Sequence, residues 1–257
     1  MKVLISVAVA GAAILGGCAS SEPLLRPETS LARLAMFDDA NQARNLEKAL
    51  TDPEIAILLD ADIKAKLPTS IAVAKVTCHY AGDSAHLDTI GTEELAGWAK
   101  AAAKQPLIKG VHPVSALSHA SESVNIASLR RSAARMGCEL LLVYLRADSG
   151  VDNYNDAAIL YWTFAGLWLV PGNTYEHQTL MEAVLVDCRT GAILGTATGE
   201  SKLSRHHAAA YKDITVDQLT QEAPKKALAD VQDRFAQTLD GIVRAAEAKA
   251  KAQTAMP

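Results

Sequence analysis

The sequence predicts an α/β (α+β) fold, in which a mixed β-sheet of about five to six strands is covered by helices. Three observations lead to this prediction. A strand, a helix that ends at a glycine and a second strand follow one another between Leu107 and Arg146. Two long apolar runs flank a glycine-containing turn at Asp187–Gly191, as in a β-hairpin. An apolar stripe with steps of three and four residues then predicts a long C-terminal helix.

Length and composition favour one domain with an extended N-terminal tether. The chain has 257 residues, of which 49% are hydrophobic, and this is enough to build a core. The net charge of −4 is mild, and no basic patch indicates a nucleic-acid partner. The sequence contains no Gly-x-Ser-x-Gly, Walker or His-Glu-x-x-His motif. It therefore predicts no catalytic residue, no cofactor and no metal ligand.

The N-terminus has the pattern of a bacterial export signal. Lys2 precedes an apolar stretch, Val3 to Leu15, that is shorter than the roughly 20 residues of a membrane span. Leu15-Gly-Gly-Cys18 then resembles a lipobox, in which the signal is removed before Cys18 and the cysteine is acylated. Acyl chains hold a protein at a membrane, and Ala19, by resemblance to bacterial sorting signals, favours the outer membrane. The alternative is an ordinary secretory signal with a chance cysteine.

We expect four segments along the chain. Residues 1–17 are the lipoprotein signal peptide, residues 18–68 a tether with N-terminal helices, residues 69–247 an α/β periplasmic domain, and residues 248–257 a disordered tail. Within the second segment, Glu54–Lys66 carries apolar residues on one helical face, and Pro68 ends this helix.

The domain is expected to begin with a strand at Ser70–Cys78, followed by a polar loop at 81–91. An alanine-rich helix over Thr92–Lys104 has two acidic residues in its first turn. A second strand covers Leu107–Leu117, and Pro113 places it at a sheet edge or a bulge because proline cannot donate to a ladder.

A helix then opens at Ser121 or Ser123 as the cap and ends before Gly137. The strand Glu139–Arg146 is apolar on both faces, so we expect it at the centre of the sheet, joined to the preceding strand by a right-handed crossover. A polar loop follows at 148–156.

The segment Ala157–Pro171 combines aromatic and apolar residues and has three interpretations. It is a buried strand paired with the first arm of the hairpin, a surface loop that touches lipid or a partner, or a short buried helix. On the second interpretation its side chains form a candidate interaction surface: Tyr161, Trp162, Phe164, Leu167 and Trp168.

The hairpin has arms at Thr174–Cys188 and Ala192–Leu203. Two residues are expected to shape its turn, because Asp187 can accept backbone N–H groups and Gly191 can adopt a positive φ. Asp187 and Arg189 form a candidate ion pair across this turn.

After a polar stretch at 204–215, the C-terminal helix begins at Pro224 or is broken there. Its stripe is expected to pack on the sheet, with a coiled coil as the alternative. The stripe comprises Leu228, Val231, Phe235, Leu239 and Ile242.

Three cysteines besides Cys18 lie in or beside strand-like runs. Cys78, Cys138 and Cys188 are expected to be buried thiols, with one disulfide as the alternative. An enzyme of unknown class also stays open, with His206, His207 and Asp187 as its candidate groups.

Three stretches carry a resemblance to a known family: Ile71–Val76, Ala134–Val143 and Val184–Leu194. Over roughly residues 70–247 the chain resembles the periplasmic α/β domain of curli-secretion-type lipoproteins and the amino-terminal domain of the Tol-system propeller protein. The resemblance implies an outer-membrane lipoprotein that faces the periplasm and acts by assembly or binding rather than catalysis. Its partners would be the membrane, through Cys18, and an envelope protein that the sequence does not identify, with a homo-oligomer as a further expectation.

Curli-secretion channels have two long strand pairs that build a membrane barrel, and this chain departs from that pattern. The link from Arg146 to Thr174 has room for at most one such hairpin, and the second equivalent, Ser201–Thr215, is short and polar. We therefore expect a non-pore scaffold or accessory protein. The alternative is a ring-forming secretion or transport component with Ala157–Pro171 inserted into lipid.

Overall fold

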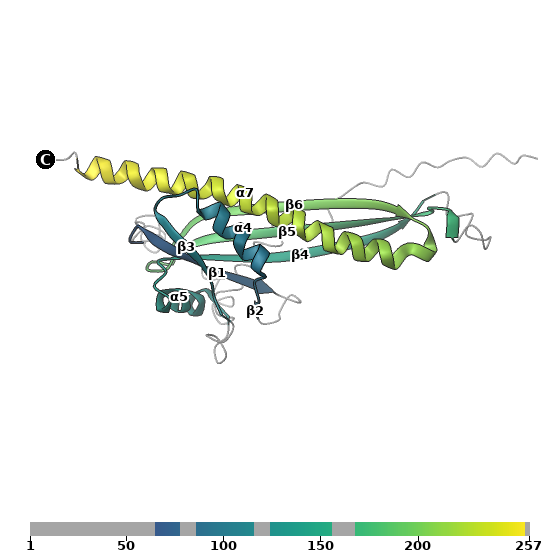
Figure 1. The fold of residues 1–257 in the computed structure, drawn as a ribbon, viewed down its shortest axis with the longest axis horizontal. Helices are drawn as coiled ribbons and strands as arrows, with labels where there is room; N and C mark the ends of the chain where they lie inside the picture. Colours follow the sequence, from purple (N-terminus) through teal and green to yellow (C-terminus); the bar gives the residue numbers. More distant parts are fainter. Residues whose placement is uncertain (1–64, 78–85, 116–123, 156–167, 255–257) are drawn as a thin grey trace, which may run out of the picture.

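The computed structural model describes residues 65–77, 86–115, 124–155 and 168–254. They form a six-stranded mixed sheet with strand order β2-β1-β4-β5-β6, and β3 also pairs with β1 (Figure 1). This confirms the predicted α+β fold. The elements are β1 Thr69–Thr77, β2 His86–Asp88, α4 Thr92–Ala102, β3 Ile108–Pro113, α5 Ile126–Arg135, β4 Leu140–Tyr154, β5 Asn173–Asp187, β6 Ile193–His207, the 3₁₀ helix η3 Ala209–Tyr211, and α7 Lys212–Thr254.

Helices lie on both faces of this sheet and give it two apolar layers. On one face, here called the α7 face, Trp98 of α4 and Phe235 of α7 pack on Tyr144 and its neighbours in the sheet. On the other, the α5 face, Leu129 of α5 packs on Leu141 and adjacent residues. The run Leu140–Leu145 is buried on both faces, as predicted for a central strand. Since β1 pairs in parallel with both β3 and β4, the chain crosses over β1 through α5.

Three strands of 15 residues each form an elongated arm. Every residue of β4 from Leu140 to Tyr154 pairs with a residue of β5, and β5 pairs with β6 over the same length. We call the end of the arm at Asp187 the turn end and the end at Asn173 the distal end. At about 3.3 Å per residue, the two ends are roughly 46 Å apart.

The arm corrects two expectations. The residues from 148 to 154, expected in a polar loop, continue β4. The first arm of the hairpin pairs with β4 and not with Ala157–Pro171. The far half of β4 carries polar residues such as Arg146, Asp148 and Asp152 and lacks an apolar signature, which explains both errors.

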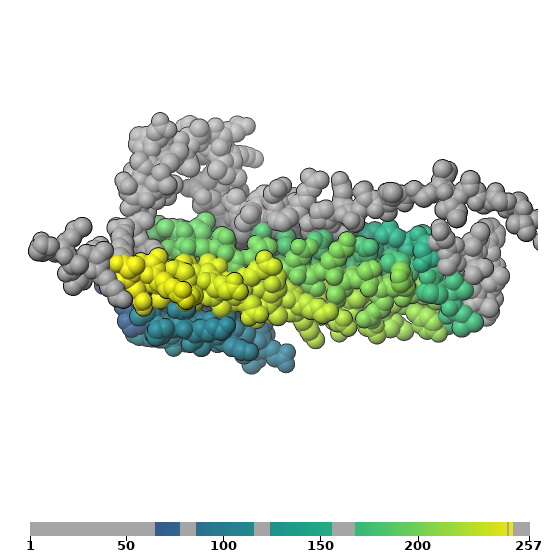
Figure 2. Space-filling view, turned by 90° about the horizontal axis from the view of Figure 1, so that it is seen from above, coloured from purple at the N-terminus to yellow at the C-terminus, as the bar shows by residue number. Residues whose placement is uncertain are grey.

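The long helix α7 lies along the arm and also contacts α4 (Figure 2). Its stripe packs on the sheet, as predicted: Val231, Phe235 and Leu239 are buried against the α7 face. Pro224 lies inside α7 and neither starts nor divides it. The helix also continues through residues 248–254, where we expected a tail.

Smaller differences concern the first half of the domain. β2 occupies part of the expected loop at 81–91. The cap of α5 is Asn125, whose side chain accepts a hydrogen bond from Ser128 N–H at 2.8 Å, rather than Ser121 or Ser123. Gly137 follows α5 with φ +73°, as expected for a helix end, and Pro113 is the last residue of the edge strand β3. Among the described helices, none is both long and apolar enough to cross a membrane.

Candidate functional site

The hairpin turn is built as the sequence predicts. Asp187 is buried, and its Oδ1 accepts a hydrogen bond from Arg189 N–H at 2.8 Å. Gly191 has φ +78° and donates its N–H to the carbonyl oxygen of Asp187. A register shift between Leu185 and Val186 marks a β-bulge or irregularity beside the turn. These interactions give Asp187 and Gly191 a structural role.

Arg189 does not form the expected ion pair with Asp187. Its guanidinium instead makes a two-pronged contact with the carboxylate of Glu139. On the α5 side of the turn, Arg130 donates to the carbonyl oxygens of Cys188 and Arg189. The second oxygen of Asp187 accepts the N–H of Ala65 at 3.2 Å, so the turn also holds the chain that enters the domain.

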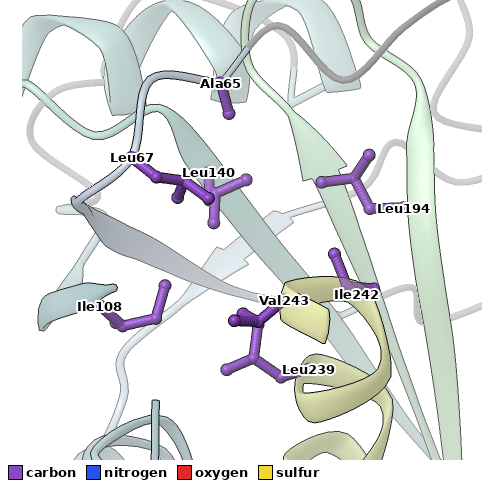
Figure 3. Close-up of a pocket in the computed structure, with 8 residues that line it drawn as sticks. All are labelled: Ala65, Leu67, Ile108, Leu140, Leu194, Leu239, Ile242 and Val243. Carbon is purple, nitrogen blue, oxygen red and sulfur yellow. The ribbon is translucent and has the colours of Figure 1, made fainter. Parts of the chain in front are cut away.

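A small cavity lies beside this entry point, between the segment that precedes β1 and α7, with side chains of β3, β4 and β6 around it (Figure 3). Its volume is about 20 Å³, and it is lined by apolar side chains alone. Such a space holds about one water molecule, and an apolar cavity of this kind stays dry. It is a packing gap and not a ligand site. Its lining residues are Ala65, Leu67, Ile108, Leu140, Leu194, Leu239, Ile242 and Val243.

The distal end of the arm has the opposite character, because large apolar side chains are exposed there. We call this group the distal tip; its members have exposed fractions of 46–78% and are Tyr154, Trp168, Leu169, Tyr211 and Ile214. The rings of Trp168 and Tyr211 meet edge to face with their centres 6.1 Å apart. The tip is the most concentrated group of exposed large apolar residues in the described part of the chain.

The sequence identified only Trp168 of this group. Trp168 and Leu169 are helical and exposed, so the end of Ala157–Pro171 that the structure describes is not a buried strand. The other members of the predicted surface, Tyr161, Trp162, Phe164 and Leu167, lie outside the described residues. Tyr154, Tyr211 and Ile214 stand singly in polar sequence, and only the fold brings them together.

Charged residues of β4 and α7 lie next to the distal tip. Asp152 of β4 accepts a hydrogen bond from Lys212 Nζ at 2.9 Å, and its other oxygen lies 3.3 Å from Nε2 of the buried His207. Asn155 connects β4 to the segment before β5, since its N–H donates to Gly172 O and its side chain donates to Pro171 O. Burial tends to raise the pKa of Asp152, but Lys212 and His207 outweigh it, so this pKa is lowered overall.

A second charged group lies on the same face of β4, nearer the turn end. Asp148 accepts hydrogen bonds from Thr179 Oγ1 at 2.6 Å and Arg146 Nε at 2.7 Å. His177, which is buried, lies 3.5 Å from it. His177 and His207 thus each face one aspartate of β4 on the α7 face of the sheet. In the described ranges, no group of three or more His, Cys, Asp or Glu side chains converges to hold a metal ion.

The three candidate groups of the enzyme alternative do not meet. His206 and His207 lie at the distal end and point to opposite faces of β6, whereas Asp187 lies at the turn end. With the arm between them, roughly 46 Å separates these groups. The structure therefore does not assemble them into one site.

Cys138 and Cys188 are free thiols, so neither forms the alternative disulfide, and Cys78 lies outside the described residues. Burial raises the pKa of Cys138, and it raises the pKa of Cys188 to about 12. A raised pKa keeps a thiol protonated and unreactive. Both side chains accordingly serve packing.

The burial of Glu182 was not predicted from the sequence. Glu182 of β5 is only 1% exposed, and neither carboxylate oxygen has a hydrogen-bond partner among the described residues. Burial raises its pKa from an ordinary 4.5 to about 7. It lies on the α5 face between the apolar residues Leu180 and Val184, so it is a cost to the fold rather than part of a polar network.

Comparison with known proteins leaves the family of this chain open. No family model matches it, and no curated protein matches it. Among solved structures, the chain is similar to a PelC dodecamer from Paraburkholderia phytofirmans, at 13% identity and TM-score 0.31, covering 68% of this chain and 93% of that one. It is also similar to the lipoprotein GNA1162 from Neisseria meningitidis, at 14% identity and TM-score 0.30, covering 60% of this chain and 97% of that one. Likeness of this degree carries no argument about what this chain does.

Proposed function

We propose that this chain is a lipid-anchored protein of the bacterial envelope that acts as a non-enzymatic assembly or binding component. Acylated Cys18 would hold it at the outer membrane, facing the periplasm, and the distal tip would be its binding surface. The observation that carries the proposal is the exposed cluster at the tip. The anchor rests on the lipobox pattern at Leu15–Cys18.

The composition of the tip is that of a binding surface. Two tyrosines, a tryptophan and two aliphatic side chains are exposed together at one end of the arm. Tyr and Trp supply large contact areas with few rotatable bonds and are enriched in interfaces and binding hot spots. Single exposed apolar residues are ordinary, but a contiguous group of them marks an interaction site.

The arm gives this surface a firm base. Both edges of β5 are paired along nearly its whole length, and α7 packs on β5 and β6. Ala65, the first residue that the structure describes, is bound at the turn end, so the distal tip lies at the opposite end of the arm from it. The arm therefore separates the tip from the point where the described domain begins.

The proposal can be tested in cells with a photo-crosslinking residue placed at Ile214 of the full-length protein. We expect a discrete crosslinked product that disappears when Trp168→Ala and Tyr211→Ala are combined. The matched control places the crosslinker at Ile193, which is 66% exposed at the turn end and should give no such product. Equal products from both positions, or a product that survives the double substitution, would contradict binding at the tip.

The anchor is tested separately by fractionation. We expect Cys18→Ser to move the protein from the membrane fraction to the soluble periplasmic fraction, because the acyl chains supply the attachment. A Cys18→Ser protein that stays fully membrane-bound would refute the anchor while leaving the tip open to test.

A second candidate, a ring-forming secretion or transport component, is favoured by the two different edges of the sheet. One edge carries β2 and β3, and the other is the 15-residue β6. Unlike edges of one sheet can pair head to tail between copies, and such contacts form a ring when the rotation from copy to copy closes. It predicts an oligomer of fixed stoichiometry for the acylated protein in mild detergent, measured by light scattering; a monomer would rule it out.

A further inference from the structure

We infer that Asp152 is the positioning residue of the distal tip, holding the start of α7 so that Tyr211 stays against Trp168. The functional consequence of this inference rests on the proposed function, because the tip has to be the binding surface for its position to matter. Asp152 belongs to β4 and is not a member of the tip. It acts through Lys212, the residue that follows Tyr211 and opens α7.

The geometry makes Asp152 a direct side-chain connection between β4 and the first turn of α7. One carboxylate oxygen accepts from Lys212 Nζ at 2.9 Å, and the other is 3.3 Å from His207 Nε2. His207 ends β6, and η3 with Tyr211 follows it directly. Asp152 therefore holds the short connection from β6 to α7 at both ends, and Tyr211 lies within that connection.

His207 occupies the start of this connection. Its Nδ1 lies 3.1 Å from the carbonyl oxygen of Ala208, and its Nε2 faces the carboxylate of Asp152 at 3.3 Å. Asp152 therefore lies between the end of β6 and the start of α7, next to His207 on one side and Lys212 on the other.

The surrounding charges are otherwise paired or farther from Asp152. On β6, Arg205 contacts Glu222 and Gln218 of α7. Asp213 and Tyr154 lie near Lys212 and favour its cationic form. On β5, the residues opposite Asp152 and Tyr154 are the neutral Tyr175 and Asn173.

The chain supplies a matched control in Asp148. It lies four residues earlier on the same face of β4, and it also faces a cation and a buried histidine, Arg146 and His177. Its partners belong to β4 and β5, whereas Asp152 reaches α7. Neutralising Asp148 removes a similar charged group without touching the connection that holds Tyr211.

Hydrogen–deuterium exchange of the full mature protein in detergent separates the two aspartates. We expect Asp152→Asn to raise amide exchange in residues 209–217 by about tenfold or more, because local opening costs less once the connection is released. Exchange in 226–245 should stay unchanged, and Asp148→Asn should leave 209–217 unchanged. If Asp152→Asn prevents folding, Lys212→Met, which keeps the Asp152–His207 contact, should produce the same local rise. Unchanged exchange in both variants, or an equal rise from Asp148→Asn, would overturn the inference.

The crosslinker at Ile214 then distinguishes this inference from the proposed function. A local rise in exchange together with a weaker crosslinked product supports both. A local rise with an undiminished product supports the positioning role of Asp152 and counts against binding at the tip. A lost product without any change in exchange overturns the positioning role.

Discussion

Gly199 of β6 lies directly against the backbone of Ala227 in α7. A Cβ atom at position 199 would stand 2.4 Å from the carbonyl oxygen of Ala227 and 2.4 Å from the N atom of Val231. No flexible side chain separates strand and helix at this point. The close approach of α7 to β6 depends on the missing side chain of Gly199.

We therefore expect Gly199→Ala to destabilise the fold by about 1–3 kcal/mol, since the helix has to move away from the strand. The measurement is the free energy of unfolding in urea. The control is Gly241→Ala, which lies inside α7 and has nothing within 4 Å of its added Cβ; it should stabilise the protein by about 0.5–1 kcal/mol through helix propensity. Equal effects of the two substitutions would show that α7 does not approach β6 as described.

The buried carboxyl of Glu182 should make stability depend on pH in an unusual direction. Its pKa is about 7 in the folded protein and near 4.5 when exposed, so it is fully protonated in the fold at acid pH. Its contribution is best below pH 4.5, worsens as the pH rises to about 7 and then stays constant. The total cost above pH 7 is on the order of 3 kcal/mol.

We expect Glu182→Gln to stabilise the protein at pH 8 and to remove most of the loss of stability between pH 5 and 7. Glu176→Gln is the matched control, because Glu176 lies on the same face of β5 but pairs with Lys202 at 3.1 Å. Its substitution should leave the pH profile unchanged within about 0.5 kcal/mol, as usual for surface ion pairs. Melting temperatures of the three proteins across this pH range provide the test.

Asp187 should be important for stability at the turn end. Asp187→Ala removes the acceptors for the N–H groups of Arg189 and Ala65, so we expect a loss of about 2–3 kcal/mol in the free energy of unfolding. Asp187→Asn keeps one acceptor oxygen and should lose roughly half as much. Chemical denaturation of both variants checks this order, and an alanine variant as stable as the parent would exclude the structural role.

The thiols of Cys138 and Cys188 should resist alkylation in the native protein. Burial raises both pKa values, that of Cys188 to about 12, so the reactive thiolate is scarce at pH 8. Mass spectrometry after brief iodoacetamide treatment should find both cysteines unmodified in native protein and modified in urea. Rapid native labelling of Cys188 would indicate that the turn end is open to solvent.

Local chemistry made several features predictable from sequence alone. The lipobox pattern and the acylation of Cys18 stay predictions. The turn could be predicted because the residues that shape it, Asp187 and Gly191, lie within five positions of each other; in the structure Asp187 accepts the N–H of Arg189 and Gly191 has a positive φ. The central strand at Leu140–Leu145 and the packing stripe of α7 could also be predicted. A fully apolar run is typical of a strand covered on both faces, and a period of 3.6 residues is typical of a helix with one buried face.

Only the tertiary structure decided how far the strands extend and where the exposed apolar surface lies. The distal halves of β4 and β6 have polar sequences, and they are strands because β5 pairs with both of them. Tyr154, Trp168 and Tyr211 come from three separate segments, and no sequence pattern connects them. The sequence by itself determined the local elements and the hairpin turn, whose interactions are short in range. The tip and its support by Asp152 depend on contacts between residues far apart in the chain, which exist only once the arm has folded.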